Sequence, residues 1–238
     1  MMKISVCMAT YNGEKFIRKQ LRSILKQLNE NDELIISDDS STDDTVPIIK
    51  SFHDRRILLM ENNTFYHPVF NIENALKCAR GEYIFLADQD DIWLDNKIEI
   101  CLDYLKEYDL VLTDCMIIDQ DEHIIADSFF RLRKTRPGLI KNLWVNSYIG
   151  CCMVFNKKIL TKSLPFPKNI AMHDSWIGLI AELCGKTKMV NQKLVLYRRH
   201  QRNISSTSGH SRLNLYTKLK YRVILFICLL KRVYFSGN

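Results

Sequence analysis

The chain has 238 residues, enough for one sizeable α/β domain with at most a small appendage. Hydrophobic residues make up 47% and charged residues 26%, which is ordinary for a globular protein in water. Only 8 Gly and 5 Pro are present, so little of the chain resembles linker or low-complexity sequence, and no internal repeat is visible.

The N-terminal residues 1–8 carry one lysine and a short apolar run. They lack the longer apolar core and cleavage site of a signal peptide, so we interpret the run as a first strand. None of the eight cysteines forms a CxxC pair, and most lie inside apolar runs, which predicts reduced, buried thiols and a cytoplasmic protein. They are Cys7, Cys78, Cys101, Cys115, Cys151, Cys152, Cys184 and Cys228.

Charge is distributed unevenly along the chain. Glu182 is the last acidic residue and twelve Lys and Arg follow it, whereas residues 1–182 carry 22 basic and 27 acidic residues. An acidic body with a wholly basic end predicts an anionic partner for that end.

Strands and helices alternate in the first half. Apolar runs predict strands over residues 4–9, 34–37, 57–60 and 83–87. Between them, Ser41 and Asp44 are spaced as a capping box, and residues 70–79 predict a helix that ends at Gly81. Another helical face is formed by Ile17, Leu21, Ile24, Leu25 and Leu28.

This alternation predicts a mostly parallel sheet covered by helices on both faces. Three of the strands release polar residues at their carboxyl ends, at positions 10–12, 38–39 and 88–91. Ligands of such sheets bind at that edge, where the strand order reverses, so the sequence predicts a nucleotide site there.

Residues 88–91 (Asp-Gln-Asp-Asp) give the sharpest signal. Three carboxylates in four positions repel one another unless a cation or protons lie among them, and Mg²⁺ takes one or two carboxylates together with phosphate oxygens. A solvated acidic turn that caps a helix beginning near Asp95 is the alternative. The position at a strand end favours the metal.

Asp38 and Asp39 follow the second strand. A carboxylate there can accept the N3–H of uracil or thymine, a donor that adenine lacks, and we favour this role over a plain turn. His173 and Asp174 begin a helical pattern that ends at Gly185. The local pattern favours Asp174 as a helix cap, with a catalytic base as the alternative.

Residues 197–203 are dense in hydrogen-bond donors and follow a short strand at 194–196. Guanidinium groups bind phosphate in a bidentate fashion, so we favour a loop closing over a diphosphate over a solvated edge. His200 has three interpretations: a phosphate contact, a metal ligand or a surface residue.

Residues 216–235 combine five basic residues with an apolar run at 223–230. Eight apolar residues cannot span a bilayer, which needs about 20. A basic amphipathic helix lying on a membrane surface is favoured, and the alternative is a terminal helix packed on the domain or in a homodimer.

Four stretches together closely resemble the family 2 glycosyltransferases with a GT-A fold, in particular the bacterial rhamnosyltransferase-like subgroup that builds surface polysaccharide. They occur in the family's order, cover about residues 3–203, and read ISVCMATYNGEKFIRKQLRSIL, ELIISDDSSTDDT, ARGEYIFLADQDDIW and HDSWIGLIAELCG followed by LVLYRRH.

The resemblance implies a GT-A domain over residues 1–205, with a nucleotide-sugar half at 1–115 and an acceptor and base half at 116–205. Residues 206–238 form the basic helical extension. It also implies inverting transfer of a sugar, rhamnose being the commonest, from a dTDP- or UDP-sugar to a hydroxyl of a glycan or lipid-linked acceptor. Mg²⁺ or Mn²⁺ is the implied cofactor. The implied location of the protein is the inner face of the cell membrane.

Motif by motif, the resemblance assigns Asp88 and Asp90 to the metal, with Asp90 in direct contact. It assigns Asp174 as the general base, which reverses the helix-cap preference. The implied donor contacts are Ala9, Thr10, Tyr11, Asp38, Asp39, Asp88, Gln89, Arg198, Arg199 and His200. The implied acceptor pocket comprises Trp93, Gly150, Cys151, His173 and Trp176.

Two positions depart from the family pattern: Ser40, where Gly is usual, and Ser175, where an aromatic residue is frequent. Two competing functions are disfavoured. A nucleotidyltransferase is expected to carry a Gly-rich basic loop after the first strand, which residues 10–13 do not form. A nucleic-acid-binding module lacks a recognisable motif in the basic segment, so no nucleic acid partner is expected.

Overall fold

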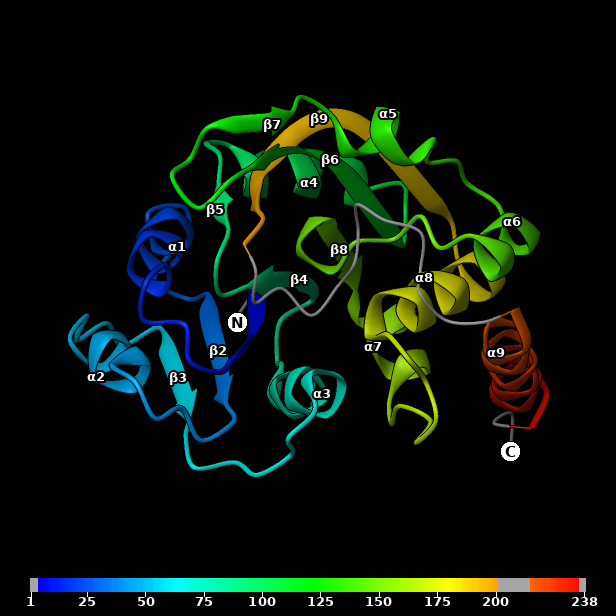
Figure 1. Cartoon of the computed structure of the whole chain (residues 1–238), viewed down its shortest axis with the longest axis horizontal. Coiled ribbons are helices and arrows are strands. Elements are labelled where there is room, and N and C mark those ends of the chain that lie inside the picture. The colour runs from blue at the N-terminus through cyan, green and yellow to red at the C-terminus, as the bar shows by residue number, and fades with distance from the viewer. Residues whose placement is uncertain (1–3, 201–214, 236–238) are drawn as a thin grey trace.

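The computed structural model describes residues 4–200 and 215–235. Its core is a nine-stranded sheet with the order β3-β2-β1-β4-β8-β6-β9-β5, and β7 pairs with β6 beside this path (Figure 1). The first four strands are all parallel and are β1 (Ile4–Thr10), β2 (Glu33–Asp38), β3 (Ile57–Met60) and β4 (Tyr83–Asp88).

The second half of the sheet is mixed. β8 runs antiparallel to both β4 and β6 and so joins the halves into one sheet, while β9 pairs parallel with β6 and antiparallel with β5. These strands are β5 (Ile92–Trp93), β6 (Leu110–Ile118), β7 (Ile124–Ala126), β8 (Met153–Asn156) and β9 (Thr187–Arg198).

Helices cover both faces of this sheet, as the sequence predicts. Along the chain the strand order runs outward from β1 to β3 and then returns to β4, so right-handed crossovers place α1 and α2 on one face and α3 on the other (Figure 1). The helices of the first half are α1 (Ile17–Leu25), α2 (Thr45–Lys50), α3 (Pro68–Cys78) and α4 (Lys97–Leu105).

Helices α6, α8 and α9 lie side by side at the right of Figure 1. The helices of the second half are α5 (Phe129–Arg133), α6 (Leu139–Trp144), α7 (Lys157–Ser163), α8 (His173–Cys184) and α9 (Leu215–Phe235), with the short 3₁₀ turn η1 (Gly150–Cys152). The predicted domain boundary at residue 205 lies outside the described residues.

The predicted strands are confirmed to within a residue at their ends. The apolar runs of β1, β2 and β4 are buried on both faces of the sheet, whereas the edge strand β3 is only half-buried. β9 is longer than the strand predicted at 194–196. Its first residues are mostly half-buried or exposed and include Lys188, Gln192 and Lys193, so the apolar pattern does not reveal them.

Two predictions about helix ends are wrong. Ser41 does not cap α2, because its hydroxyl donates to Asp38 Oδ2 (2.6 Å); Asp43 Oδ1 instead accepts the amide of Thr45 (3.0 Å). α1 ends at Leu25, although Leu28 is still buried in the core.

Gly81 is also used differently from the helix cap predicted. α3 ends at Cys78 with Ala79 as its cap, and the Gly81 amide donates to Ser5 Oγ (2.7 Å) on β1. A Cβ atom on Gly81 would lie 2.5 Å from the backbone nitrogen of Ser5. The residue is therefore required for the close approach of the β4 entry to β1.

We expect Gly81→Ala to lower the free energy of unfolding by about 1–3 kcal/mol, because the added methyl group meets backbone that cannot move alone. Urea unfolding measures the change, with the neighbouring exposed residue in Glu82→Ala as the matched control. Equal stability of the two variants would contradict the close approach.

The C-terminal helix α9 packs on the domain. Leu229 is buried, and the Arg232 guanidinium donates to the carbonyl oxygens of Lys162, Leu164 and Pro165 before α8. Of the helices within residues 4–200 and 215–235, none has the length and apolar character needed to cross a bilayer.

Candidate active site

The polar ends of β1, β2 and β4 meet at one edge of the sheet, as predicted. Thr10 lies opposite Asp38 on one side of β1, and Ala9 lies opposite Asp88 on the other. The parallel register therefore brings the three polar clusters into one line.

Asp38 has a structural role in this arrangement. Its carboxylate accepts the hydroxyl groups of Thr10 (2.8 Å) and Ser41 (2.6 Å) and the Ser41 amide (2.8 Å). Thr10 and Asp38 are both 1% exposed. These two residues, predicted to contact the donor, instead fix the loop after β2 against β1.

Asp39 and Tyr11 are arranged differently. Asp39 Oδ1 accepts the amide of Phe65 (2.6 Å), and no group of the described residues hydrogen-bonds to its Oδ2. The Gln89 side chain pairs with both backbone groups of Tyr11 (2.9 and 3.0 Å), which leaves the Tyr11 ring 56% exposed. Ala9, another predicted donor contact, is half-buried and pairs with Ser37 of β2.

The carboxylates that follow β4 are crowded. Burial, with added repulsion from Asp90 and Asp174, raises the pKa of Asp88 to about 7. Burial also raises the pKa of Asp91 well above its usual range. Ligand atoms of Asp88, Asp91 and Cys151 all lie within 4.8 Å of one another. Such a group favours either protons or a cation.

A buried lysine beside these carboxylates was not predicted. Lys97 is 0% exposed, donates to the carbonyl oxygen of Cys151 (2.7 Å) and lies 4.0 Å from the Trp93 ring centre. Its charge lowers the pKa of Asp88 and so offsets part of the repulsion. A lysine at the start of a mostly apolar helical segment is the signal that would have revealed it.

Asp90 pairs with a side chain from the far end of the chain. Asp90 Oδ2 lies 2.8 Å from Nε2 of His200, and both side chains are largely shielded from solvent. The His200 ring stacks on Phe16 with ring centres 5.1 Å apart. Residue 200 is thus brought directly to the predicted metal-binding residue.

Arg198 corrects another prediction. It was expected to contact the donor, but its side chain is 1% exposed and its guanidinium donates to backbone carbonyls of Asp90, Asp119 and Gln120. Its amide donates to Asp91 Oδ1 (2.8 Å). Arg198 therefore holds the turn at residues 88–91 in place.

Arg199 is half-buried, and burial lowers the pKa of its guanidinium. Its Nε and Nη2 are enclosed without a hydrogen-bond partner among the described residues. Both nitrogens are shielded from solvent. The remaining predicted loop residues, 201–203, lie outside the described residues.

Asp174 lies in the first turn of α8 and is 6% exposed. Met172, not Asp174, is the residue at the N-cap position. Burial raises the pKa of Asp174 to about 6, against hydrogen bonds from Ser175 and Asn146 that lower it. Because its charge also raises the pKa of Asp88, the two carboxylates share one electrostatic environment.

The predicted acceptor residues divide into two groups. His173 lies against Gly150, where a Cβ atom would come within 2.9 Å of His173 Nε2, and burial lowers the pKa of His173 to about 4. Trp93, Cys151 and Trp176 are at most 1% exposed, and the Trp176 indole donates to the carbonyl of Ser163 (2.8 Å). These three side chains pack in the core.

Ser40 explains one departure from the family pattern. Its φ of 60° lies in the left-handed region that favours glycine, and its hydroxyl donates to the Asn63 carbonyl (2.6 Å). Gln20 was missed as well: it is fully buried on the apolar face of α1, and its amide donates to the Asp88 carbonyl (2.8 Å). A polar residue within that apolar stripe was the available signal.

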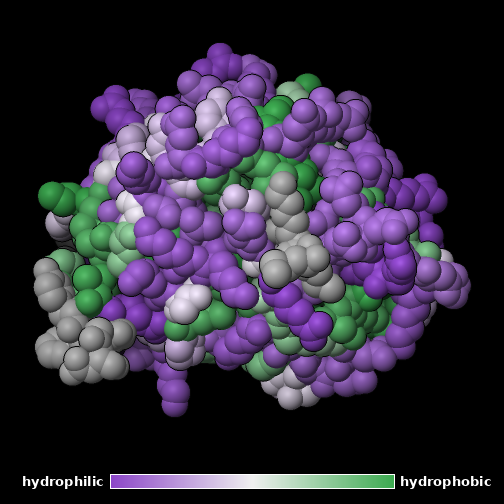
Figure 2. Space-filling view, turned by 180° about the vertical axis from the view of Figure 1, so that it is seen from behind, coloured by the Kyte–Doolittle hydropathy of each residue, from purple (hydrophilic) through white to green (hydrophobic). Residues whose placement is uncertain are grey.

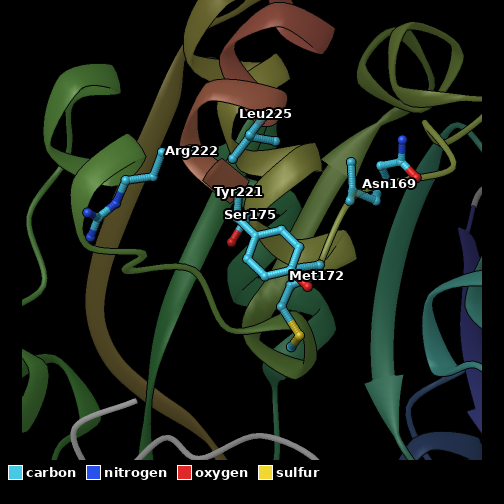
Figure 3. Close-up of a pocket in the computed structure, with 8 residues that line it drawn as sticks. Asn169, Met172, Ser175, Tyr221, Arg222 and Leu225 are labelled. Atoms are coloured by element: carbon cyan, nitrogen blue, oxygen red, sulfur yellow. The ribbon is translucent and has the colours of Figure 1, made fainter. Parts of the chain in front are cut away.

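A small cavity lies beside α8, between the loop before α8 and helix α9. Its volume is about 90 Å³, and its walls include Met172 and Ser175 on one side and Tyr221 and Leu225 on the other (Figure 3). Ser175 follows Asp174 directly, so α9 reaches the neighbourhood of the predicted base.

The family model described as Glycosyl transferase family 2 matches residues 5–164 of the chain. The chain belongs to this glycosyltransferase family. Neither competing function, a nucleotidyltransferase or a nucleic-acid-binding module, is favoured by this membership.

Two bacterial relatives cover most of the chain. One is the UDP-Glc:alpha-D-GlcNAc-diphosphoundecaprenol beta-1,3-glucosyltransferase WfaP of Escherichia coli, 28% identical over 85% of this chain and 80% of its own length. Another is the dTDP-rhamnosyl transferase RfbG of Shigella flexneri, 27% identical over 90% of this chain and 81% of its own length.

Solved structures show the GT-A fold that was predicted. TarS of S. aureus in complex with UDP-GlcNAc has a TM-score of 0.74 at 20% identity, covering 95% of this chain and 67% of that one. A mannosyltransferase of Pyrobaculum calidifontis in complex with GDP-Man and Mn2+ has a TM-score of 0.65 at 19% identity, covering 84% and 58%. At these identities the likeness shows the fold.

The raised pKa of Asp88 makes a prediction about stability. The folded chain keeps this proton up to about pH 7, while the unfolded chain releases it near its ordinary pKa of 3.8, so stability is lost as the pH rises between these values. We expect Asp88→Asn, measured by urea unfolding in chelator, to raise the free energy of unfolding at pH 8 by about 1–3 kcal/mol and to change little at pH 4.

Asp95→Asn is the matched control, because Asp95 is exposed and pairs only with Lys26 across the surface. We expect it to change the stability by less than about 0.5 kcal/mol at either pH. A neutral or destabilising effect of Asp88→Asn at pH 8 would contradict the crowding of carboxylates.

Proposed function

We propose that this protein is a metal-dependent, inverting glycosyltransferase that moves a hexose, with rhamnose or glucose the first candidates, from a dTDP- or UDP-sugar to a hydroxyl of a lipid-linked glycan. The observation that carries the proposal is the shared environment of Asp174 and the Asp88–Asp91 turn. The carboxylates of the turn would hold a cation beside the leaving diphosphate, and Asp174, whose pKa is raised, would take the proton from the attacking acceptor hydroxyl.

The donor would bind along the ends of β1, β2 and β4. The unoccupied Oδ2 of Asp39 offers an acceptor for the N3–H of a pyrimidine, and the exposed ring of Tyr11 offers a stacking surface. The half-buried Arg199 supplies donors for phosphate oxygens. The relatives named for UDP-Glc and dTDP-rhamnose support a pyrimidine nucleotide.

The donor atoms at the turn fit a divalent cation. Carboxylate and imidazole ligands suit Mn²⁺, and carboxylates suit Mg²⁺. Asp91 and Cys151 are 0% exposed, so Asp88, Asp90 and His200 are the residues that would hold an ion in contact with a diphosphate. When bound, the ion supplies positive charge that stabilises the departing diphosphate.

The chain's own residues would carry the proton transfer. With a pKa of about 6, Asp174 is ionised at neutral pH yet basic enough to accept a proton from the acceptor hydroxyl as its oxygen forms the new bond to the anomeric carbon. Asn146 and the Ser175 amide hold the carboxylate in one orientation. His173 and Gly150 would form the adjoining wall of the acceptor site.

We further propose that the enzyme works at the inner face of the cell membrane. The relative named for a diphosphoundecaprenol-linked substrate supports a lipid-linked acceptor. The cysteine pattern and the basic C-terminal segment support the cytoplasmic side.

Asp174→Asn should lower the rate of sugar transfer by about 10²–10⁴-fold, because the amide cannot accept the proton. Binding of the nucleotide sugar should be retained, since Asp174 faces the acceptor. The transfer rate is measured with the nucleotide sugar that a donor screen identifies, and binding of that nucleotide sugar is measured by calorimetry. A turnover within a few-fold of the wild type would remove Asp174 from this role.

Asp90→Asn and His200→Ala should each weaken Mn²⁺-dependent UDP binding by at least about tenfold. Calorimetry with and without Mn²⁺ measures the effect, and Asp95→Asn serves as the surface control. If both variants bind UDP with the metal as tightly as the wild type, the ion is held elsewhere.

A further inference from the structure

The two halves of the chain carry opposite charge. Residues 128–238 hold 21 Lys and Arg and only two acidic residues, whereas residues 1–127 hold 13 Lys and Arg and 25 Asp and Glu. Both acidic residues of the second half are engaged: Asp174 is buried, and Glu182 accepts the Tyr148 hydroxyl (2.9 Å). The surface built from this half is therefore strongly basic.

Helix α9, in this basic half, exposes an apolar face. Its inner side packs on the domain through Leu229, while five apolar side chains at helical spacing are 36–49% exposed on the outer side. These are Val223, Phe226, Ile227, Leu230 and Val233. Figure 2 shows the corresponding hydrophobic surface along the edge of the molecule formed by α9.

Helix α6 extends this surface. Ile140, Trp144 and Val145 are 74%, 55% and 51% exposed. The Arg222 guanidinium of α9 lies 4.7 Å from the Trp144 ring centre and donates to the Trp144 carbonyl (2.6 Å), so the two helices are fixed side by side. We call these eight exposed apolar residues of α6 and α9 the α6–α9 face.

The basic residues around the α6–α9 face favour an anionic partner. Lys220 and Lys231 are exposed on α9, Lys141 on α6 is half-buried, and neither helix contains an acidic residue. A second copy of the chain would bring like charges together, and nucleic acid would leave the apolar side chains in water. An anionic bilayer satisfies both features, because its headgroups attract lysine and its acyl boundary accepts Trp, Phe and Leu.

We propose that the α6–α9 face docks the protein on an anionic phospholipid membrane as one rigid surface. This inference deepens the proposed function, on which it rests only for the lipid-linked nature of the acceptor. It adds α6 to the membrane contact and fixes the orientation of the domain on the bilayer.

This orientation has a consequence for the acceptor. The cavity between α8 and α9 lies behind the face, with Tyr221 and Leu225 of α9 toward Ser175, while Arg222 points away toward α6 (Figure 3). Docking through the face would therefore hold the base-bearing end of α8 close to the lipid boundary. A lipid-borne hydroxyl could then reach Asp174 while its lipid stays in the membrane.

The test is co-sedimentation of the full chain with vesicles of phosphatidylcholine, with and without phosphatidylglycerol, in the absence of nucleotide sugar. We expect binding to the anionic vesicles only, weakened by salt. The double variant Phe226→Glu with Leu230→Glu, and separately Ile140→Glu on α6, should each bind at least about tenfold more weakly. Ile124→Glu with Ile125→Glu is the matched control, because these apolar side chains on β7 lie in the acidic half and are more exposed than Phe226 and Leu230.

Each outcome decides the proposal. If the α9 double variant binds anionic vesicles within twofold of the wild type, the proposal that the α6–α9 face docks on membranes is wrong. If only the α9 variant loses vesicle binding, α6 takes no part in the docking. A wild-type dimer in sedimentation velocity that these substitutions dissociate would make the face a self-association surface instead. Nucleotide-sugar hydrolysis should survive all the variants, so failure of the docking and failure of the transferase assignment are separated.

Discussion

Several carboxylates are crowded together at the carboxyl ends of the strands, and residues from the second half of the chain pack around them and hold them in place. Asp88, Asp91 and Asp174 all lie where burial raises their pKa. Folding without a cation must therefore bring like charges together out of water, which opposes stability at neutral pH. The buried Lys97 offsets part of this repulsion, and a divalent ion would offset more. This repulsion among the carboxylates lowers the stability of the ion-free protein and favours binding of a cation between them.

The long strand β9 keeps these groups in register. Its last residue, Arg198, binds the turn at residues 88–91 through its amide and guanidinium, and the same side chain reaches the loop after β6. His200 is carried to Asp90 as a result. The basic segment after β9 thus begins from a fixed point beside the proposed ion, with Arg198 buried and His200 next to Asp90.

Much of this could be predicted from the sequence, and the failures have physical causes. Continuous apolar runs identified β1 to β4, and the polar residues at their ends identified the edge of the site. Burial of individual polar side chains depends on the neighbours that the fold supplies, so the sequence could not show that Asp38 and Arg198 are consumed by internal hydrogen bonds. For the same reason the sequence could not show that Trp93 and Trp176, predicted to line the acceptor pocket, pack in the core.

The central claim is that Asp90, His200 and Asp174 act on one nucleotide sugar from opposite sides. The most direct measurement is a crystal structure with UDP and Mn²⁺, in which anomalous scattering locates the ion. We expect an ion bonded to Asp90 and His200 at about 2.0–2.2 Å, with the diphosphate next to it and the Asp174 carboxylate across an open sugar-sized space. An ion bound away from Asp90, or a diphosphate separated from Asp174 by packed protein, would contradict the claim.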